Sequence, residues 1–413
     1  MTAPEITVYG AFWCPDCHRS KQFLGEHQIP YRWVDIEEDA EGERFVIEAN
    51  RGKRRIPTLA FGDGSVLANP SNAELATRLG LKTTAERHHY DLVIVGGGPA
   101  GLTAALYAAR EGIDTLVVER AAVGGQAAAT MRLDNVPGFP EGIGGADLSG
   151  RFRAQAERFG VELLQAQEVA RLHSRDNYHS IVTADGSEYS GLALVLATGS
   201  RYRRLGVPGE DEYIGAGVHF CATCDGPFYK GRSVAVIGGG NSAAEESLFL
   251  TRFADRVTLL VRGDSLRASQ VIREKVLRQP EIEVRFNTEV ERFEGADSKL
   301  HTVRARDTLT GEAEDLRLPG AFVFIGLDPN TGFLADSAVR LDRWGFIVTG
   351  HALVHDGDPP AGFEGAEPAI LGTSVPGIFA AGDVRAASTK QVASAAGEGA
   401  AVALMIRDYL KRV

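Results

Sequence analysis

The chain contains two cysteines that are followed directly by a carboxylic acid, in the motif Cys221-Ala-Thr-Cys224-Asp225. Cysteines separated by two residues can close a small disulfide ring, whose redox poise depends on which thiolate the fold stabilises. Two-electron disulfide chemistry also requires a proton donor, and Asp225 is placed to supply one. The motif is therefore typical of a redox-active disulfide that carries its own acid.

Half of a zinc site is the alternative for Cys221 and Cys224. Structural zinc sites usually combine two such pairs about 15 to 20 residues apart. Here the other pair, Cys14 and Cys17, stands at the opposite end of the chain. We therefore expect no metal site, and we expect both pairs to be redox pairs.

The N-terminal pair lies in Trp-Cys-Pro-Asp-Cys at 13–17, after an alternating run at 5–10 that predicts a strand. Pro15 suits the first turn of a helix, whose free N–H groups and dipole would stabilise a thiolate on Cys14. Cys14 is the candidate nucleophile and Cys17 the resolving thiol. An inert docking domain is the alternative, although only a reactive pair needs cysteine at both positions.

A second strand is expected at 31–36, then a helix, and then a strand opened by Pro57, a candidate for a cis peptide bond beside the cysteines. With Ile-Pro-Thr at 56–58, Asp-Gly-Ser at 63–65 and Asn-Pro-Ser at 69–71, about the first 80 residues resemble glutaredoxins, particularly the mycoredoxin-like members. The resemblance implies a thioredoxin-like fold. It leaves the thiol partner open between glutathione, mycothiol and a protein.

Length and charge exclude several classes of protein. At 413 residues we expect two or three domains. The net charge of −11 argues against non-specific binding to nucleic acid or an anionic membrane. The start has no signal-peptide pattern, and no apolar run approaches the roughly 20 residues of a spanning helix, so we expect a soluble, cytoplasmic protein.

A buried-strand pattern at 90–95 runs into Gly-Gly-Gly-Pro-Ala-Gly at 96–101, with a helix expected at 102–111. Gly96 allows the tight turn, Gly98 lets the backbone approach a pyrophosphate, and Gly101 permits helix–strand contact. The helix N-terminus takes the phosphate charge, and Glu119, after the next strand, can bond a ribose hydroxyl. This context predicts a dinucleotide-binding loop.

A second copy follows a strand at 233–237 and reads Gly-Gly-Gly-Asn-Ser-Ala at 238–243. Two fingerprints imply two nucleotides. The next strand, 257–261, ends in Arg262, with Arg267 close behind, where an NAD site usually places an acid. Arginines there suit a 2′-phosphate and hence NADP, and two solvated surface arginines are the alternative.

Two further strand ends carry small polar motifs. A strand at 194–200 contains Ala-Thr-Gly at 197–199, and a strand at 377–383 ends in Gly382-Asp383 before Lys-Gln-Val-Ala at 390–393 and a helix of small residues. Such a Gly-Asp is suited to hydrogen-bonding the ribityl and pyrophosphate part of a flavin. Taken alone, it could equally be a turn.

Through these motifs together with Gly-Gly-Gln at 124–126, residues 90–413 resemble low-molecular-weight thioredoxin reductases over essentially their whole length. The resemblance implies FAD, NADPH and a homodimer. It also implies that Cys224 faces the flavin, Cys221 performs interchange and Asp225 handles the proton. The cofactor-binding candidates are Gly96, Gly98, Pro99, Ala100, Gly101, Glu119, Gly125, Gln126, Asn135, Ala197, Thr198, Gly199, Gly238, Gly240, Asn241, Ser242, Ala243, Arg262, Arg267, Gly382, Asp383, Gln391 and Val392.

The predicted fold class is α/β, with a thioredoxin-like domain and two Rossmann-like dinucleotide-binding domains of a thioredoxin-reductase-type flavoprotein. The predicted divisions are a glutaredoxin-like domain at 1–80, a linker at 81–89, an FAD-binding domain split between 90–205 and 326–413, and an NADPH-binding domain with the redox pair at 206–325. An additional Pro- and Gly-containing segment, about 351–368, is expected to be a surface loop.

These features predict a disulfide reductase that passes electrons from NADPH to FAD, to Cys221/Cys224, to Cys14/Cys17 and to an external disulfide. That disulfide belongs to a protein or to a low-molecular-weight thiol. One alternative is a peroxiredoxin reductase resembling the flavoprotein of alkyl hydroperoxide reductase. Another, of a different class, is a flavin-bound redox sensor or docking protein.

Overall fold

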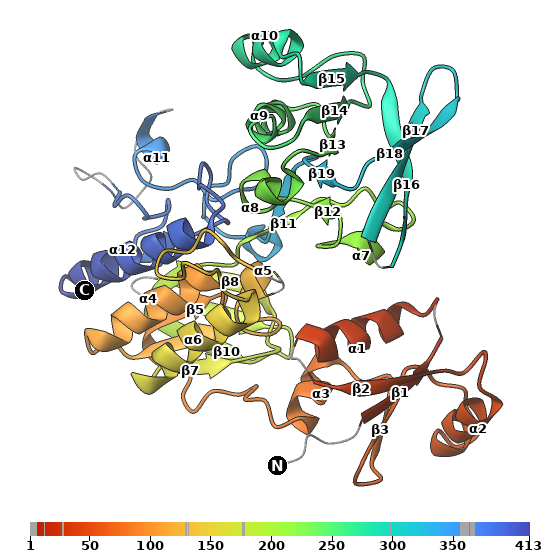
Figure 1. Cartoon of the computed structure of the whole chain (residues 1–413). Helices are drawn as coiled ribbons and strands as arrows, with labels where there is room; N and C mark the ends of the chain where they lie inside the picture. Colours follow the sequence, from red (N-terminus) through yellow and green to blue (C-terminus); the bar gives the residue numbers. More distant parts are fainter. Residues whose placement is uncertain are drawn as a thin grey trace. The chain divides into compact units, whose positions relative to one another are not determined.

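The computed structural model describes residues 6–11, 13–26, 29–128, 130, 132–175, 178–297, 299–355, 363 and 368–413. The chain divides into two compact units. The first unit comprises 1–129, 144–199 and 330–413, and the second comprises 130–143 and 200–329. Figure 1 shows the elements of both, and the predicted α/β class is confirmed.

The first unit begins with a four-stranded sheet of order β2-β1-β3-β4, in which β1 and β2 are parallel and the other pairs antiparallel. The strands expected at 5–10 and 31–36 are confirmed, and the Ile56–Pro57 bond is cis. The elements are β1 (Ile6–Gly10), α1 (Pro15–Glu26), β2 (Tyr31–Asp35), α2 (Ala40–Ala49), β3 (Thr58–Phe61), β4 (Val66–Ala68) and α3 (Asn72–Arg78).

The same unit contains a seven-stranded sheet of order β7-β6-β5-β10-β9-β8, with β21 also paired to β10. Its central strands are parallel. The strands are β5 (His89–Val95), β6 (Thr115–Val118), β7 (Glu162–Leu164), β8 (Val169–Arg175), β9 (Tyr178–Thr183), β10 (Glu188–Leu196) and β21 (Ile378–Ala380). The helical segments are α4 (Pro99–Arg110), α5 (Gly125–Ala128), α6 (Gly145–Arg158), η2 (Gly332–Leu334), α11 (Ala352–His355) and α12 (Val392–Leu410).

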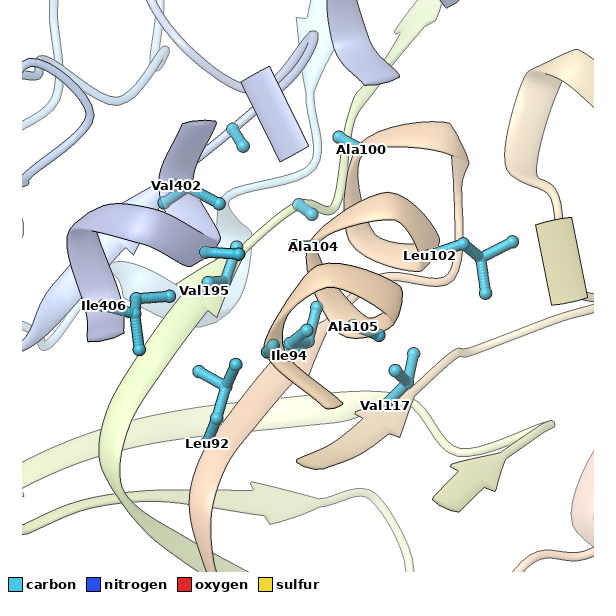
Figure 2. Packing of buried hydrophobic residues seen from close by; sticks show 14 of the residues in the cluster. Leu92, Ile94, Ala100, Leu102, Ala104, Ala105, Val117, Val195, Val402 and Ile406 are labelled. Atoms are coloured by element: carbon cyan, nitrogen blue, oxygen red, sulfur yellow. The ribbon is translucent and has the colours of Figure 1, made fainter. Parts of the chain in front are cut away.

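One face of this sheet is covered by α4, α6 and α12 (Figure 1). Figure 2 shows Leu92, Ile94 and Val195 of the strands packed against Ala104 of α4 and Ile406 of α12. A Cβ on Gly399 would lie 2.3 Å from the backbone oxygen of Ala100, so glycine allows α12 to approach α4 this closely. This packing fixes the start of α4, which carries the first glycine loop.

The helix expected at 102–111 begins earlier, at Pro99, because proline in the first turn is pre-organised for a helical backbone. The segment expected as a loop at 351–368 begins instead with α11. Most of its remainder, 356–362 and 364–367, lies outside the described residues.

The second unit contains a parallel sheet of order β12-β19-β13-β14-β15 and an antiparallel sheet β16-β17-β18. A short pair, β11 and β20, also belongs to it. The strands are β11 (Ser200–Tyr202), β12 (Val218–His219), β13 (Ser233–Ile237), β14 (Arg256–Leu260), β15 (Ile282–Arg285), β16 (Thr288–Ala296), β17 (Lys299–Asp307), β18 (Ala313–Arg317), β19 (Ala321–Val323) and β20 (Leu327–Pro329). The helical segments are α7 (Glu210–Tyr213), α8 (Ala222–Asp225), η1 (Gly226–Tyr229), α9 (Asn241–Leu250) and α10 (Gln270–Arg278).

The segment expected as a linker, 81–89, makes specific contacts within the first unit. Lys82 Nζ lies 2.8 Å from the Glu162 carboxylate at the start of β7, and the Lys82 carbonyl accepts from the Gln165 N–H. His89 already belongs to β5. The segment is therefore tied to the seven-stranded sheet. Among the described helices, none is long and apolar enough to cross a membrane.

Candidate active site

The C-terminal cysteine pair lies where β12 leads into the short helix α8. Cys221 and Cys224 form a disulfide, and the Cys224 N–H donates to Cys221 Sγ at 3.2 Å. Cys221 is the N-cap residue of α8, and its carbonyl accepts from the Asp225 N–H. The turn therefore places a carboxylic acid one residue beyond a closed two-cysteine ring.

Sequence reasoning missed two side chains beside this acid. His219 Nδ1 lies 3.2 Å from Asp225 Oδ2, and His219 Nε2 lies 2.6 Å from the Tyr229 hydroxyl. Tyr229 is 6% exposed, and its burial, followed by the Asp225 charge, raises the pKa of its phenol. The sequence did contain one signal for this contact, since His219 stands on a strand two residues before Cys221.

The N-terminal pair lies at the start of α1, and both sulfurs are free thiols. The Cys17 N–H donates to Cys14 Sγ at 3.2 Å, which favours negative charge on Cys14. Trp13 is 64% exposed beside the pair. Burial, followed by the hydrogen bond with Cys14, raises the pKa of Cys17 to about 12. The two thiols are thus chemically unequal, as a nucleophile and a resolving thiol require.

Iodoacetamide is expected to label Cys14 well before Cys17 in the native protein. At pH 8 a thiol of pKa about 12 is ionised in only about one molecule in ten thousand, and the thiolate is the reactive form. Peptide mass spectrometry over pH 7–9 measures both rates, and urea-denatured protein is the control in which both label. Equal labelling of the two in the native state would contradict the assignment.

The first glycine loop connects β5 to α4, and its glycines are required by space. Gly96 has φ 109°, and a Cβ there would meet the Ala197 oxygen at 2.4 Å. A Cβ on Gly101 would lie 1.9 Å from the Gly96 oxygen. At Gly98, the N-cap residue, no atom lies within 4 Å of an added Cβ. The loop is closed on the protein side and open where a phosphate would lie.

Glu119 follows β6 and is buried beside this loop. Its carboxylate accepts from the Gly97 N–H at 2.7 Å and from the Ala121 N–H at 2.9 Å. Gly125 and Gln126 belong to α5 in the same unit. Asn135 belongs to the second unit, so its grouping with them stays a prediction.

The two other small-residue motifs also lie at strand ends of the first unit. Thr198 and Asn330 exchange hydrogen bonds of 2.8 Å after β10, beside Ala197 and Gly199. After β21, Gly382 has φ 79° and its N–H donates to Glu398, which also forms a two-bond ion pair with Arg385.

Asp383 follows directly, and burial raises the pKa of its carboxyl. Lys390 Nζ donates to the Asp383 carbonyl at 2.6 Å, and burial lowers the pKa of Lys390 to about 8. Gln391 and Val392 are the N-cap and the first residue of α12. The segment 382–392 is thus a fixed polar turn at a helix N-terminus.

The second glycine loop connects β13 to α9 in the second unit. Gly238 has φ 146°, and a Cβ there would meet the Phe324 oxygen at 2.3 Å, whereas Gly240 is open. Asn241, Ser242 and Ala243 form the first turn of α9. The Arg267 N–H donates to the Gly239 carbonyl at 2.7 Å, which brings the 262–267 segment, with the exposed Arg262 and Arg267, beside the loop.

These residues fit two dinucleotides. Each loop leaves an open backbone cradle at a helix N-terminus, where N–H groups and the dipole attract phosphate. Asp383 is half-buried, and its carboxyl can form a hydrogen bond with a hydroxyl of a ribityl chain, which would offset the cost of burying it. Among the described residues, no group of His, Cys, Asp and Glu could hold a metal ion.

Comparison with known proteins matches both parts of the chain. A model described as pyridine nucleotide-disulphide oxidoreductase matches residues 90–399, and a glutaredoxin model matches residues 6–66. The thioredoxin reductase of Treponema pallidum is 42% identical over 321 residues, which are 78% of this chain and 97% of that protein. The thioredoxin reductase of Streptomyces clavuligerus is 40% identical over 321 residues, 78% of this chain and 94% of that protein.

Solved structures of thioredoxin reductases are also similar to this chain. The thioredoxin reductase of Streptococcus pyogenes MGAS5005 is similar with a TM-score of 0.70 at 35% identity, covering 79% of this chain and 99% of that one. The thioredoxin reductase of Giardia duodenalis has a TM-score of 0.70 at 32% identity, covering 79% of this chain and 100% of that one.

Proposed function

Because the chain belongs to the thioredoxin reductase family of pyridine nucleotide-disulphide oxidoreductases and carries a glutaredoxin domain, we propose that it passes electrons from NADPH through FAD and Cys221/Cys224 to Cys14/Cys17, and then to an external disulfide. The chain is a disulfide reductase with a Cys-x-x-Cys redox centre. Beyond this family activity, we propose that the electrons leave the protein through the Cys14/Cys17 pair.

One observation carries this exit. The chain holds two Cys-x-x-Cys pairs, Cys221/Cys224 at the start of α8 and Cys14/Cys17 at the start of α1. In the N-terminal pair, Cys14 receives an N–H hydrogen bond whereas Cys17 is held protonated. Cys14 then attacks the external disulfide, and Cys17 resolves the mixed disulfide.

The family implies FAD and a nicotinamide nucleotide. When bound, these groups supply hydride transfer and a two-electron store. The first loop and Asp383 would hold FAD, and the second loop would hold the nicotinamide nucleotide. Asp225 gives a proton to a sulfur when the Cys221–Cys224 bond is reduced. We further propose a homodimer, on the family resemblance.

The choice of NADPH over NADH rests on Arg262 and Arg267. Both are exposed next to the second loop, where a 2′-phosphate would lie. An Arg262→Ala/Arg267→Ala variant is expected to raise KM for NADPH at least about tenfold, since a hydrogen bond to a charged group contributes about 1.5–3 kcal/mol. KM for NADH should change little.

Steady-state kinetics with both nucleotides measure this difference. Arg278→Ala, which removes another exposed charge from the second unit, is the control and should leave both constants unchanged. Equal losses with NADPH and NADH in the double variant would refute the 2′-phosphate assignment.

NADPH oxidation by the purified protein against a panel of disulfides tests the function as a whole. The panel comprises low-molecular-weight thiol disulfides, an oxidised thioredoxin-like protein and an oxidised peroxiredoxin. We expect turnover with glutaredoxin-type disulfides. Turnover with the peroxiredoxin alone would instead assign a peroxiredoxin reductase, and no turnover with any member would assign a redox sensor.

A further inference from the structure

A row of hydrogen-bonding side chains leads away from the Cys221–Cys224 pair within the second unit. It runs from Asp225 to His219 Nδ1 at 3.2 Å, from His219 Nε2 to the Tyr229 hydroxyl at 2.6 Å, and from that hydroxyl to the Pro319 carbonyl at 3.4 Å. We propose that His219 and Tyr229 form a proton relay that reloads Asp225. The proposal rests on the assignment of Asp225 as the acid for the disulfide.

The relay residues are held in place by packing. His219 is 7% exposed on β12, and its ring centroid lies 5.4 Å from that of Tyr229 and 5.2 Å from that of Phe322. The Tyr229 ring occupies the space beside Gly320, where a Cβ would lie 2.3 Å from Tyr229 Cε1. A side chain at position 320 would therefore displace the outer member of the row.

The row can hold its protons in two arrangements that both satisfy every member. With Asp225 ionised, the Tyr229 hydroxyl donates to His219 Nε2, and Nδ1–H donates to the carboxylate. With Asp225 protonated, the carboxyl donates to Nδ1, Nε2–H donates to the Tyr229 oxygen, and the Tyr229 hydroxyl turns to the Pro319 carbonyl. The second arrangement contains one proton more, so the row can load Asp225 without leaving a buried polar atom unpaired.

The surroundings provide few competing charges. Asp225 and Arg232 are the ionised groups that act on Tyr229, and His219 is otherwise flanked by aromatic rings. Pro319, at the outer end, also lines a surface pocket of about 460 Å³ together with His301, Thr302 and Arg317. The row therefore connects the disulfide's acid to a region that water can reach.

The chemical step balances with these groups. Two electrons, supplied by the disulfide reductase activity, break the Cys221–Cys224 bond and leave two thiolates. Asp225 gives its proton to one sulfur. The imidazole then changes tautomer from Nε2–H to Nδ1–H, which gives the first arrangement. From there the carboxylate takes the Nδ1 proton, Nε2 takes the Tyr229 proton, and the Tyr229 oxygen takes a proton from water, which restores the second arrangement. In thiol–disulfide exchange, the same protons move in the opposite direction.

Alkylation of the reduced pair tests the relay in the holoprotein without NADPH or a disulfide substrate. In a Cys14→Ser/Cys17→Ser background only Cys221 and Cys224 remain, because the chain has 4 cysteines. His219→Gln can still donate and accept, but an amide does not pass protons on. We expect its iodoacetamide rate at pH 7 to fall about tenfold, less than the roughly 10²–10⁴ that a lost acid or base costs, because Asp225 remains.

A double-mutant cycle separates a relay from a merely structural histidine. If His219 acts through Asp225, then His219→Gln should have no further effect on the rate or its pH profile in an Asp225→Asn background. The same loss in both backgrounds, or no loss in either, would overturn the proposal. If electrons do not leave through Cys14, this result would not change, because the background protein lacks both N-terminal cysteines.

Gly320→Ala provides a second variant that changes no ionisable group. It should displace the Tyr229 ring and reproduce the alkylation defect of Tyr229→Phe. Retained FAD absorbance and an unchanged melting temperature identify a folded protein in each case. Wild-type alkylation profiles in both folded variants would exclude Tyr229 from the relay and reduce it to the His219–Asp225 pair.

Discussion

A Cys14→Ser variant is expected to reduce its flavin with NADPH at the wild-type rate and to lose turnover with glutaredoxin-type disulfides. Cys14 is the candidate exit nucleophile, at the start of α1 with an N–H donor 3.2 Å from its sulfur. A serine hydroxyl is not ionised at neutral pH and is a far weaker nucleophile than a thiolate. Since loss of a catalytic nucleophile costs up to about 10⁶-fold in kcat, we expect a loss of at least about 10³-fold.

Cys17→Ser is the matched control, because it keeps the nucleophile and removes only the resolving thiol. It should still form a mixed disulfide at Cys14, visible by mass spectrometry, and should retain turnover of substrates that a single thiol can handle. Wild-type turnover by Cys14→Ser would mean that the N-terminal domain is not the exit, and that disulfides are reduced directly by Cys221/Cys224.

Asp225→Asn is expected to slow reduction of the Cys221–Cys224 disulfide by about 10²–10⁴-fold while FAD stays bound. The amide keeps the shape and a donor toward the neighbouring groups, but it has no proton to give to a sulfur. Stopped-flow absorbance of the flavin after one equivalent of NADPH, over pH 6–9, measures the step directly.

Asp225→Glu is the control, since it restores an acid on a longer side chain and should recover part of the rate. An Asp225→Asn rate equal to the wild type at every pH would assign proton delivery to water. The proposed relay through His219 would then be refuted too, because its role is to reprotonate Asp225.

Local rules were sufficient to predict the conformation of the two glycine loops. A glycine at 96 or 238 is dictated by a positive φ and by a backbone oxygen 2.3–2.4 Å from any Cβ, and these constraints recur wherever a strand turns into a phosphate-binding helix. The two cysteine pairs were found for a similar reason, because their chemistry requires a fixed spacing.

His219 was missed because its role depends on contacts that spacing does not encode. It meets Asp225 only because β12 turns directly into α8, and it meets Tyr229 only because η1 folds back toward β19. The role of the 81–89 segment was likewise hidden. Its composition indicates a linker, but the Lys82 ammonium forms an ion pair with Glu162, and the Lys82 carbonyl accepts a hydrogen bond from the Gln165 N–H.

The central claim is that electrons leave through Cys14 on the same molecule or its dimer partner. It is tested by adding NADPH to fully oxidised protein, quenching with an alkylating agent, and following reduction of Cys14/Cys17 over a hundredfold range of protein concentration. The two cysteine pairs belong to one chain, so the transfer does not depend on the encounter of separate molecules and the half-time should not change. A half-time that shortens in proportion to protein concentration, or a Cys14/Cys17 pair that stays oxidised, would contradict the account.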